Sequence, residues 1–208
     1  MKKTLIQVRN MAIGHKGRYL FTDISFDICE GDVVLLCGAN GSGKTTLLKA
    51  LTEAEFKVET VMVPTRIPKV KGFTLNEFIK LSCFNTSSAE PEKALKKMGL
   101  EHLAERDIST LSDGEFQKGT IAVAIAKGAE VILLDEPTAF LDAENKRNVL
   151  RTLRKLCEET GTAVIFSSHD LHEALETCNK VIALGADGQC RISSENLKDS
   201  ISAIFSKD

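Results

Sequence analysis

The sequence predicts an α/β fold with a buried sheet. An apolar run at 33–37 leads into a glycine-rich loop at 38–44, and residues 45–52 then carry leucines at helical spacing. A second apolar run at 131–134 ends in two carboxylates. In a parallel α/β sheet, ligands bind where strands end, so both stretches are candidate parts of one site.

The chain begins with two stretches that are typical of strands, at 5–13 and 20–28. The second alternates apolar with polar side chains, which indicates a half-buried strand. Glu30 and Gly31 form a turn into the strand at 33–37.

Residues 38–46 read Gly-Ala-Asn-Gly-Ser-Gly-Lys-Thr-Thr and fit the pattern G-x-x-x-x-G-K-[ST]. Glycines let backbone N–H groups surround phosphate oxygens, and the start of a helix adds the positive end of its dipole. An accidental glycine turn is the structural alternative, but the flanking strand and helix supply the context that the motif needs. Lys44 can reach the β- and γ-phosphates, and the Thr45 hydroxyl can take one Mg²⁺ position. The predicted phosphate-binding residues are Asn40, Gly41, Ser42, Gly43, Lys44, Thr45 and Thr46.

The middle of the chain is predicted to be mainly helical. A short strand at 59–63 stops at Pro64, and a loop follows at 66–72 whose positive charges are expected to face solvent. Residues 75–103 have a helical pattern with a polar break at 85–88.

The second chemical stretch is the strand at 131–134 followed by Asp135 and Glu136. Asp135 is placed to hold a Mg²⁺ shell, and Glu136 to polarise a water that attacks a γ-phosphate. A strand with an acidic end is common by itself. Together with the glycine loop it predicts catalysis.

The last third of the chain continues the α/β pattern. The apolar residues at 149–157 are spaced to lie on one face of a helix, and this helix is predicted to end at Gly161. A strand follows at 163–167. Residues 181–192 are predicted to form a hairpin, and 197–205 a final amphipathic helix that covers the core.

The composition is that of a soluble globular protein. The 208 residues suit one domain, with 43% hydrophobic and 27% charged residues. A net charge of -2 gives no reason to expect nucleic acid or an anionic membrane as a direct partner. The six cysteines form no C-x-x-C pair, and without a signal-like start they are expected to be reduced cytosolic thiols, mostly in the core. No apolar run approaches the length of a membrane span.

Between the two chemical stretches lies Leu-Ser-Asp-Gly-Glu at 111–115. Ser112 followed three residues later by Glu115 is also a capping box, so a helix start is the structural alternative. In their order, however, the motifs resemble those of the ATP-binding cassette (ABC) family. They are Walker A at 38–45, the signature at 111–115, Walker B at 131–136, a D-loop at 140–143 and a switch histidine at His169.

The resemblance covers nearly the whole chain. It implies a P-loop NTPase fold with an ABC-type core sheet, an antiparallel β-subdomain and an inserted helical subdomain at approximately 70–127. Residues 1–208 would form a single ABC ATP-binding domain that uses ATP and Mg²⁺. Catalysis would then involve Lys44, Glu136 and His169, with His169 as the sensor of the γ-phosphate.

The resemblance further implies that two such domains pack head to tail. Ser112 and Gly114 of one domain would contact the γ-phosphate held by Lys44 of the other. Because one Walker A and one signature are present, a homodimer is expected, or a pair with another ATPase subunit.

Several positions depart from the family pattern. His15 takes the place of the aromatic residue that stacks on adenine, with Tyr19 as the alternative. Thr65 stands where the Q-loop glutamine would contact the metal or water. The segment 49–63 is too short for the usual β-hairpin after the Walker helix, so the chain resembles a trimmed family member. The signature residues Asp-Gly-Glu at 113–115 resemble those common in the ATPases of iron-siderophore, haem and cobalamin importers.

The implied function is ATP hydrolysis that drives transport by integral membrane subunits on separate chains, with residues 65–74 and 75–110 as the coupling face. The protein would be cytoplasmic, at the inner face of the cell membrane, and the cargo would be an iron chelate or similar solute. Two alternatives stay open. One is a soluble ABC ATPase of the cluster-assembly type, and the other is a weakly active regulatory nucleotide-binding protein, which Thr65 and the trimmed region motivate.

Overall fold

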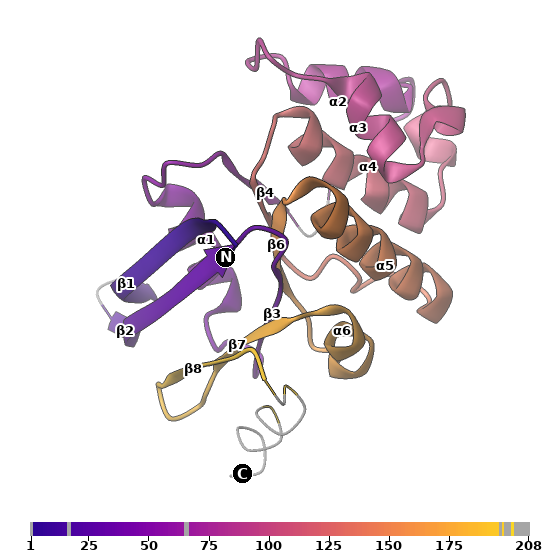
Figure 1. The fold of residues 1–208 in the computed structure, drawn as a ribbon. Coiled ribbons are helices and arrows are strands. Elements are labelled where there is room, and N and C mark those ends of the chain that lie inside the picture. Colours follow the sequence, from indigo (N-terminus) through magenta and orange to yellow (C-terminus); the bar gives the residue numbers. More distant parts are fainter. Residues whose placement is uncertain (1, 16–17, 65–66, 196, 198–200, 202–208) are drawn as a thin grey trace.

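The fold consists of a six-stranded sheet, a separate two-stranded sheet and helices around them (Figure 1). It is described by a computed structural model that covers residues 2–15, 18–64, 67–195, 197 and 201. None of the helices within these ranges combines the length and the apolar character needed to cross a membrane.

The central sheet has the strand order β4-β5-β6-β3-β7-β8. Its first five members run parallel, and β8 pairs antiparallel with β7. The strands are β3 (Val33–Gly38), β4 (Thr60–Val63), β5 (Val131–Leu134), β6 (Ala163–Ser167), β7 (Lys180–Leu184) and β8 (Cys190–Ser193). Because the parallel strands share one direction, the residues that follow β3, β5 and β6 lie at the same edge of the sheet.

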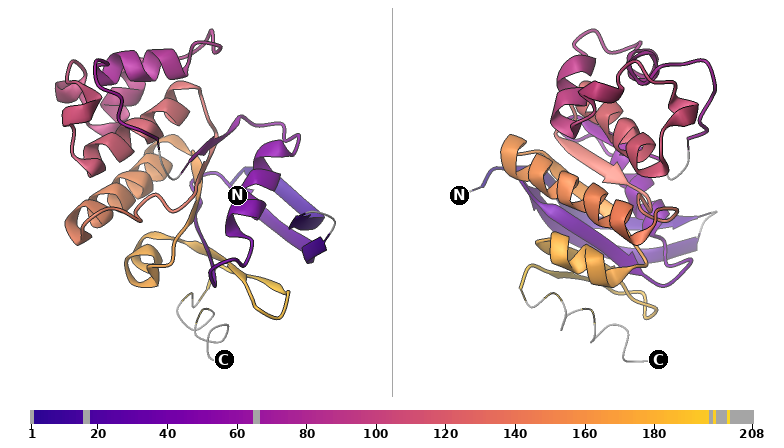
Figure 2. Two further views of the ribbon diagram at one scale, coloured as in Figure 1. Left: turned by 180° about the vertical axis from the view of Figure 1, so that it is seen from behind. Right: turned by 90° about the vertical axis from the view of Figure 1, so that its right-hand side faces the viewer.

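Continuous apolar runs form these strands because both faces of the sheet are covered. Along β3, Val34 and Leu36 join the core on one face, while Leu35 and Cys37 join the core on the other. The first face is covered by α1 (Lys44–Glu53) and by the sheet of β1 (Thr4–His15) and β2 (Arg18–Cys29), and the second by α5 (Ala143–Thr160) and α6 (Leu171–Thr177) (Figures 1 and 2).

The two-stranded sheet confirms the predicted antiparallel subdomain, since β1 pairs antiparallel with β2 through several register shifts. The chain then runs from the end of α1 at Glu53 to the start of β4 at Thr60 with no strand between them. The prediction of a trimmed connection after the Walker helix is therefore confirmed.

The central helices form a lobe of their own, called here the helical lobe (residues 75–126; Figure 1). It contains α2 (Leu75–Ser82), α3 (Pro91–Met98), the 3₁₀ turns η1 (Glu101–Leu103) and η2 (Ile108–Thr110), and α4 (Asp113–Ala126). The polar break predicted at 85–88 lies between α2 and α3. Both α2 and α4 begin with a capping box, which satisfies backbone donors that a helix start otherwise leaves without partners.

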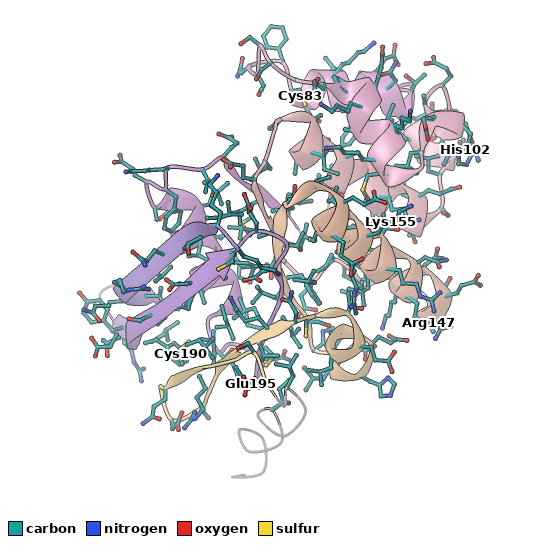
Figure 3. All side chains as sticks on the ribbon, in the orientation of Figure 1. Cys83, His102, Arg147, Lys155, Cys190 and Glu195 are labelled. Carbon is teal, nitrogen blue, oxygen red and sulfur yellow. The ribbon has the colours of Figure 1, made fainter. Side chains whose placement is uncertain are left out.

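Four of the six cysteines are buried, and Figure 3 places Cys83 within the helical lobe and Cys190 on β8. Burial raises the pKa of both Cys37 and Cys157 to about 12, so these thiols are protonated and unreactive at neutral pH. The interpretation of the cysteines as mostly core residues is confirmed. Of the predicted final helix, only Leu197 and Ile201 fall within the described residues; both are helical, and Ile201 is buried.

Candidate nucleotide-binding site

The phosphate-binding loop connects β3 to α1. Its last glycine, Gly43, is the N-cap of α1 at a φ of 101°, where a side chain would be strained. Gly41 also has a positive φ, of 78°. Because Gly43 provides no capping side chain, the first N–H groups of α1 keep their donors for another acceptor. A helix start of this kind attracts anions, as the sequence predicted for residues 40–46.

Lys44 and Ser42 give the loop the chemistry that a phosphate needs. Lys44 is only 8% exposed, and its ammonium donates to the backbone carbonyls of Gly38 at 2.9 Å and Ala39 at 3.1 Å. The buried Ser42 hydroxyl has no hydrogen-bond partner within the described chain. A buried polar group normally has a partner, and a phosphate oxygen would supply one. The residues therefore fit a phosphate group.

Thr45 and Asp135 meet at the carboxyl edge of the sheet, although 90 positions separate them in the chain. The Thr45 hydroxyl donates to Asp135 Oδ2 at 2.8 Å, which leaves the lone pairs of Thr45 Oγ1 available. One hydroxyl and one carboxylate beside a phosphate loop are the hard oxygen donors that Mg²⁺ prefers. Two of the three predicted metal ligands, Thr45 and Asp135, thus lie together and fit Mg²⁺.

Ser167, at the end of β6, holds the two acidic residues in place. Its hydroxyl donates to Asp135 Oδ1 at 2.8 Å and accepts the backbone N–H of Glu136 at 2.8 Å. The backbone of Glu136 has a φ of 50°, an unusual conformation for a side-chain-bearing residue, and the hydrogen bond that its N–H donates to Ser167 stabilises it. We assigned Ser167 no role from sequence. The available signal is a hydroxyl that ends an otherwise apolar strand at the ligand-binding edge.

Glu136 and His169 face each other across this edge. Glu136 Oε2 lies 2.8 Å from His169 Nδ1, and the glutamate side chain is 21% exposed while that of the histidine is 61% exposed. The pair brings a carboxylate and an imidazole together with Asp135. Five of the predicted site residues are therefore linked through β3, β5 and β6: Lys44, Thr45, Asp135, Glu136 and His169.

We expect Ser167→Ala to disturb both acidic residues. The substitution leaves the partly buried Glu136 N–H without its acceptor and removes a donor from Asp135 Oδ1. It should lower the free energy of unfolding by about 2 kcal/mol and kcat for ATP hydrolysis about tenfold. Urea unfolding and steady-state turnover measure the two effects. Ser88→Ala, at an exposed position without a hydrogen bond among the described contacts, is the control. Unchanged stability and turnover in Ser167→Ala would contradict the assigned role.

The signature residues at 111–115 form the start of α4. Ser112 caps the helix by accepting the Glu115 N–H, and Glu115 in turn accepts the Ser112 N–H at 2.7 Å. That backbone hydrogen bond holds the pKa of Glu115 below its usual value. Capping uses a lone pair of Ser112 Oγ, and the hydroxyl hydrogen can rotate to donate either to the Glu115 carboxylate or to an anion. The capping box and the signature interpretation are therefore compatible.

The signature segment lies against the D-loop within the same chain. A Cβ added to Gly114 would come within 2.5 Å of Asn145 Oδ1, so only glycine allows this close approach. Asn145 is itself held by Asp142, the N-cap of α5. A cavity of about 410 Å³ separates Ser112 from the D-loop, and no phosphate-loop residue lines it. Ser112 and Gly114 are therefore not brought to the phosphate loop of their own chain by any described contact.

The loop at 66–72 departs from its prediction at Lys69 but not at Lys71, which is exposed. Its positive charges were expected to face solvent, but the Lys69 ammonium donates to the Leu111 carbonyl at 2.8 Å and to Asp113 Oδ1 at 2.6 Å.

The positions of two predicted site residues cannot be tested against the structure. Thr65 lies outside the described residues. His15 ends β1, but its side chain is not among those described.

The comparisons with known proteins agree on one family. The sequence profile described as ABC transporter matches residues 21–139. The chain is 30% identical to the iron(3+)-hydroxamate import ATP-binding protein FhuC of Bacillus subtilis (strain 168), over 86% of this chain and 78% of that relative. It is 29% identical to the zinc import ATP-binding protein ZnuC of Chelativorans sp. (strain BNC1), over 91% of this chain and 71% of that relative.

The fold is similar to those of solved ABC proteins. The structure matches a transporter described as a metal-chelate type ABC transporter in an inward-facing conformation, with a TM-score of 0.84 and 25% identity, over 98% of this chain and 90% of that chain. It also matches a nucleotide-free ATP-binding cassette with a TM-score of 0.81 at 19% identity, which shows the fold alone.

Proposed function

This chain belongs to the ABC transporter family, and we propose that it is the ATP-hydrolysing subunit of an importer whose membrane-spanning subunits are separate chains. The observation that carries the proposal is the convergence of Lys44, Thr45, Asp135, Glu136 and His169 at one edge of the sheet. We take residues 1–208 as one ATP-binding domain with a helical subdomain at approximately 70–127.

The phosphate loop would bind the triphosphate of ATP. The N–H groups at the start of α1, the Lys44 ammonium and the Ser42 hydroxyl are the donors that contact the phosphates. Thr45 and Asp135 would hold Mg²⁺, which neutralises phosphate charge when bound. These groups orient the γ-phosphate and stabilise the charge that develops as its bond to ADP breaks.

Glu136 would act on the attacking water. Its carboxylate accepts a proton from the water as the oxygen bonds to the γ-phosphorus and ADP leaves, giving inorganic phosphate. His169, whose Nδ1 lies 2.8 Å from Glu136 Oε2, would orient that carboxylate and contact the γ-phosphate. Thr65 is proposed as a further contact to metal or water, and His15 as the residue that stacks on adenine.

A second copy of the chain, or a paired ATPase subunit, would complete each site. The support is chemical: the Ser112 hydroxyl can turn to donate to an anion and α4 begins at this residue, so the signature segment can bind an anion. Because the described contacts of Ser112 lie away from its own phosphate loop, the anion would be the γ-phosphate bound by the other subunit.

The membrane subunits would dock on the helical lobe. An apolar groove of about 330 Å³ lies between the loop after β4 and α2, and Leu81 at its rim is 57% exposed. We propose that this face meets the membrane subunits at the cytoplasmic side of the membrane. The groove is lined by Ile67, Pro68, Val70, Phe73, Phe78, Leu81, Ser82 and Ile108.

The cargo is proposed to be a metal ion or metal chelate. FhuC is named for import of iron(3+)-hydroxamate, ZnuC for import of zinc, and the matched transporter structure is of the metal-chelate type. ATPase subunits do not bind cargo in this proposal, so the choice between a metal and its chelate would lie with the membrane subunits.

Capture of the membrane partner tests the proposal. Tagged Glu136→Gln protein should recover a multispanning membrane protein from detergent-solubilised native cells when ATP and Mg²⁺ are present. Leu81→Asp in the same background should reduce the recovery about tenfold, because it places a charge in the apolar groove. Ile192→Asp is the matched control, since Ile192 is 40% exposed on β8, far from the helical lobe (Figure 1).

The other outcomes decide between the alternatives. Recovery of soluble proteins alone would favour a cluster-assembly ATPase, and recovery of the tagged protein alone would favour a regulatory nucleotide-binding protein. Equal loss in Leu81→Asp and Ile192→Asp would remove the apolar groove from the docking face.

A further inference from the structure

The signature segment contains negative charges next to Ser112, and Lys69 forms an ion pair with one of them. Asp113 and Glu115 place two carboxylates in the first turn of α4, next to Ser112. In the proposed function this is where a γ-phosphate must approach. Like charges repel, so an uncompensated carboxylate beside Ser112 would oppose the approach of ATP bound to the other subunit.

Lys69 contacts the signature on both sides of Ser112. Its ammonium donates to the Leu111 carbonyl at 2.8 Å, one residue before Ser112, and to Asp113 Oδ1 at 2.6 Å, one residue after it. It also lies 5.6 Å from the centre of the Phe116 ring, one turn further along α4. With its side chain only 25% exposed, Lys69 packs against the start of α4.

The same lysine belongs to the segment that links the catalytic edge to the docking groove. Lys69 and Glu136 both line a cavity of about 490 Å³. Its chain neighbours Pro68 and Val70 line the apolar groove proposed for the membrane subunits. A displacement of this segment by a docked partner would therefore be transmitted to residues 111–113 through one side chain.

We propose that Lys69 is a positioning residue that holds Ser112 and neutralises Asp113, so that the signature can bind the γ-phosphate on the opposite subunit. The inference rests on the proposed head-to-tail dimer. It adds that the ion pair between Lys69 and Asp113 is needed for that dimer to form. Glu115 differs from Asp113, because the Ser112 backbone N–H binds its carboxylate and holds its pKa below the usual value. In this arrangement, aspartate at position 113 requires lysine at position 69.

The experiment measures ATP-driven dimerisation by sedimentation velocity in the Glu136→Gln background with Mg²⁺ present. Lys69→Met keeps the aliphatic stem and removes the charge, and it should raise the dimer dissociation constant about tenfold at low salt. ATP affinity of the monomer, measured at low protein concentration with a fluorescent ATP analogue, should stay unchanged. Lys71→Met, two residues away and exposed, is the matched control.

The double variant Lys69→Met/Asp113→Asn separates charge compensation from simple loss of structure. Removing the unpaired carboxylate should restore dimerisation to within about threefold of the parent, whereas a structural defect would persist. The deficit of Lys69→Met alone should also shrink as salt screens the repulsion. Asp113→Asn alone, at an exposed side chain, should dimerise no more weakly than the parent, which tests the pair even if Lys69→Met does not fold.

Three results would overturn the inference: dimerisation of Lys69→Met equal to that of the parent, a double variant no better than Lys69→Met, or weakening by Asp113→Asn. Failure of the Glu136→Gln parent to dimerise with ATP is a different result. It would overturn the proposed head-to-tail dimer itself, and this inference with it.

Discussion

Glu136→Gln should lower kcat for ATP hydrolysis about a thousandfold while ATP binding stays intact. The amide cannot accept the proton of the attacking water, but it keeps the size of the carboxylate. Glutamine also meets the same backbone requirement as glutamate at a φ of 50°, so the free energy of unfolding should change little. With hydrolysis blocked, ATP and Mg²⁺ should convert the variant from monomer to a stable dimer, which size-exclusion chromatography with light scattering detects.

Glu92→Gln is the control for this variant, because Glu92 is exposed in the first turn of α3. It makes the same chemical change away from the sheet edge and should leave turnover unchanged. If Glu136→Gln hydrolyses ATP at the parent rate, Glu136 is not the proton acceptor. If it is inactive but stays monomeric with ATP, the head-to-tail arrangement is wrong while the catalytic assignment stands.

Lys44→Met should lower kcat/KM for ATP about a thousandfold. The ammonium is the buried cation of the phosphate loop, and methionine removes its charge and donors while keeping a similar stem. The loss should appear in nucleotide binding as well as in turnover, since Lys44 contacts phosphate before and during the reaction. Isothermal titration with a non-hydrolysable ATP analogue separates the two contributions.

Lys44→Met also removes the hydrogen bonds that Lys44 donates to the loop carbonyls, so the folding of the variant must be measured separately. Gly38 and Ala39 lose a donor in Lys44→Met, and circular dichroism with thermal unfolding reports whether the loop still forms. Lys57→Met, on the exposed connection after α1, controls for loss of a lysine. Parent-like binding and turnover in a folded Lys44→Met protein would remove Lys44 from the site.

Much of the fold could be predicted from local patterns. The buried strands were visible as short apolar runs, and the glycine loop indicated which strand leads into the site. Strand order could not be read in the same way, because β3 pairs with β6 and β7, which lie far away in sequence. The helix α6 was also missed. It spans only Leu171–Thr177, and its two buried residues are Ala174, which is small, and Thr177, which is polar. So short a helix with one small apolar residue in the core gives a weak apolar pattern.

Some residues of the site could likewise be predicted from the sequence, and others could not. Motifs indicated Lys44, Thr45, Asp135, Glu136 and His169, because each follows a recognisable strand or loop. Ser167 and Lys69 were not assigned roles, since a serine that ends a strand and a lysine in a polar loop are common. Their roles depend on partners that the fold brings near: Asp135 is 32 positions from Ser167, and Asp113 is 44 positions from Lys69. Pair geometry of this kind exists only once the chain has folded.

The position of β3 in the sheet determines when the protein can first bind a nucleotide during its synthesis. Both strands that flank β3, Ala163–Ser167 and Lys180–Leu184, are translated long after β3 itself. Until they leave the ribosome, the apolar residues of Val33–Gly38 have no strand beside them, although β1 can already pair with β2. Until then the nascent chain holds an apolar strand without partners, and exposed segments of this kind are prone to aggregation. ATP binding should appear abruptly, once the chain up to residue 184 has left the ribosome and β7 can pair with β3.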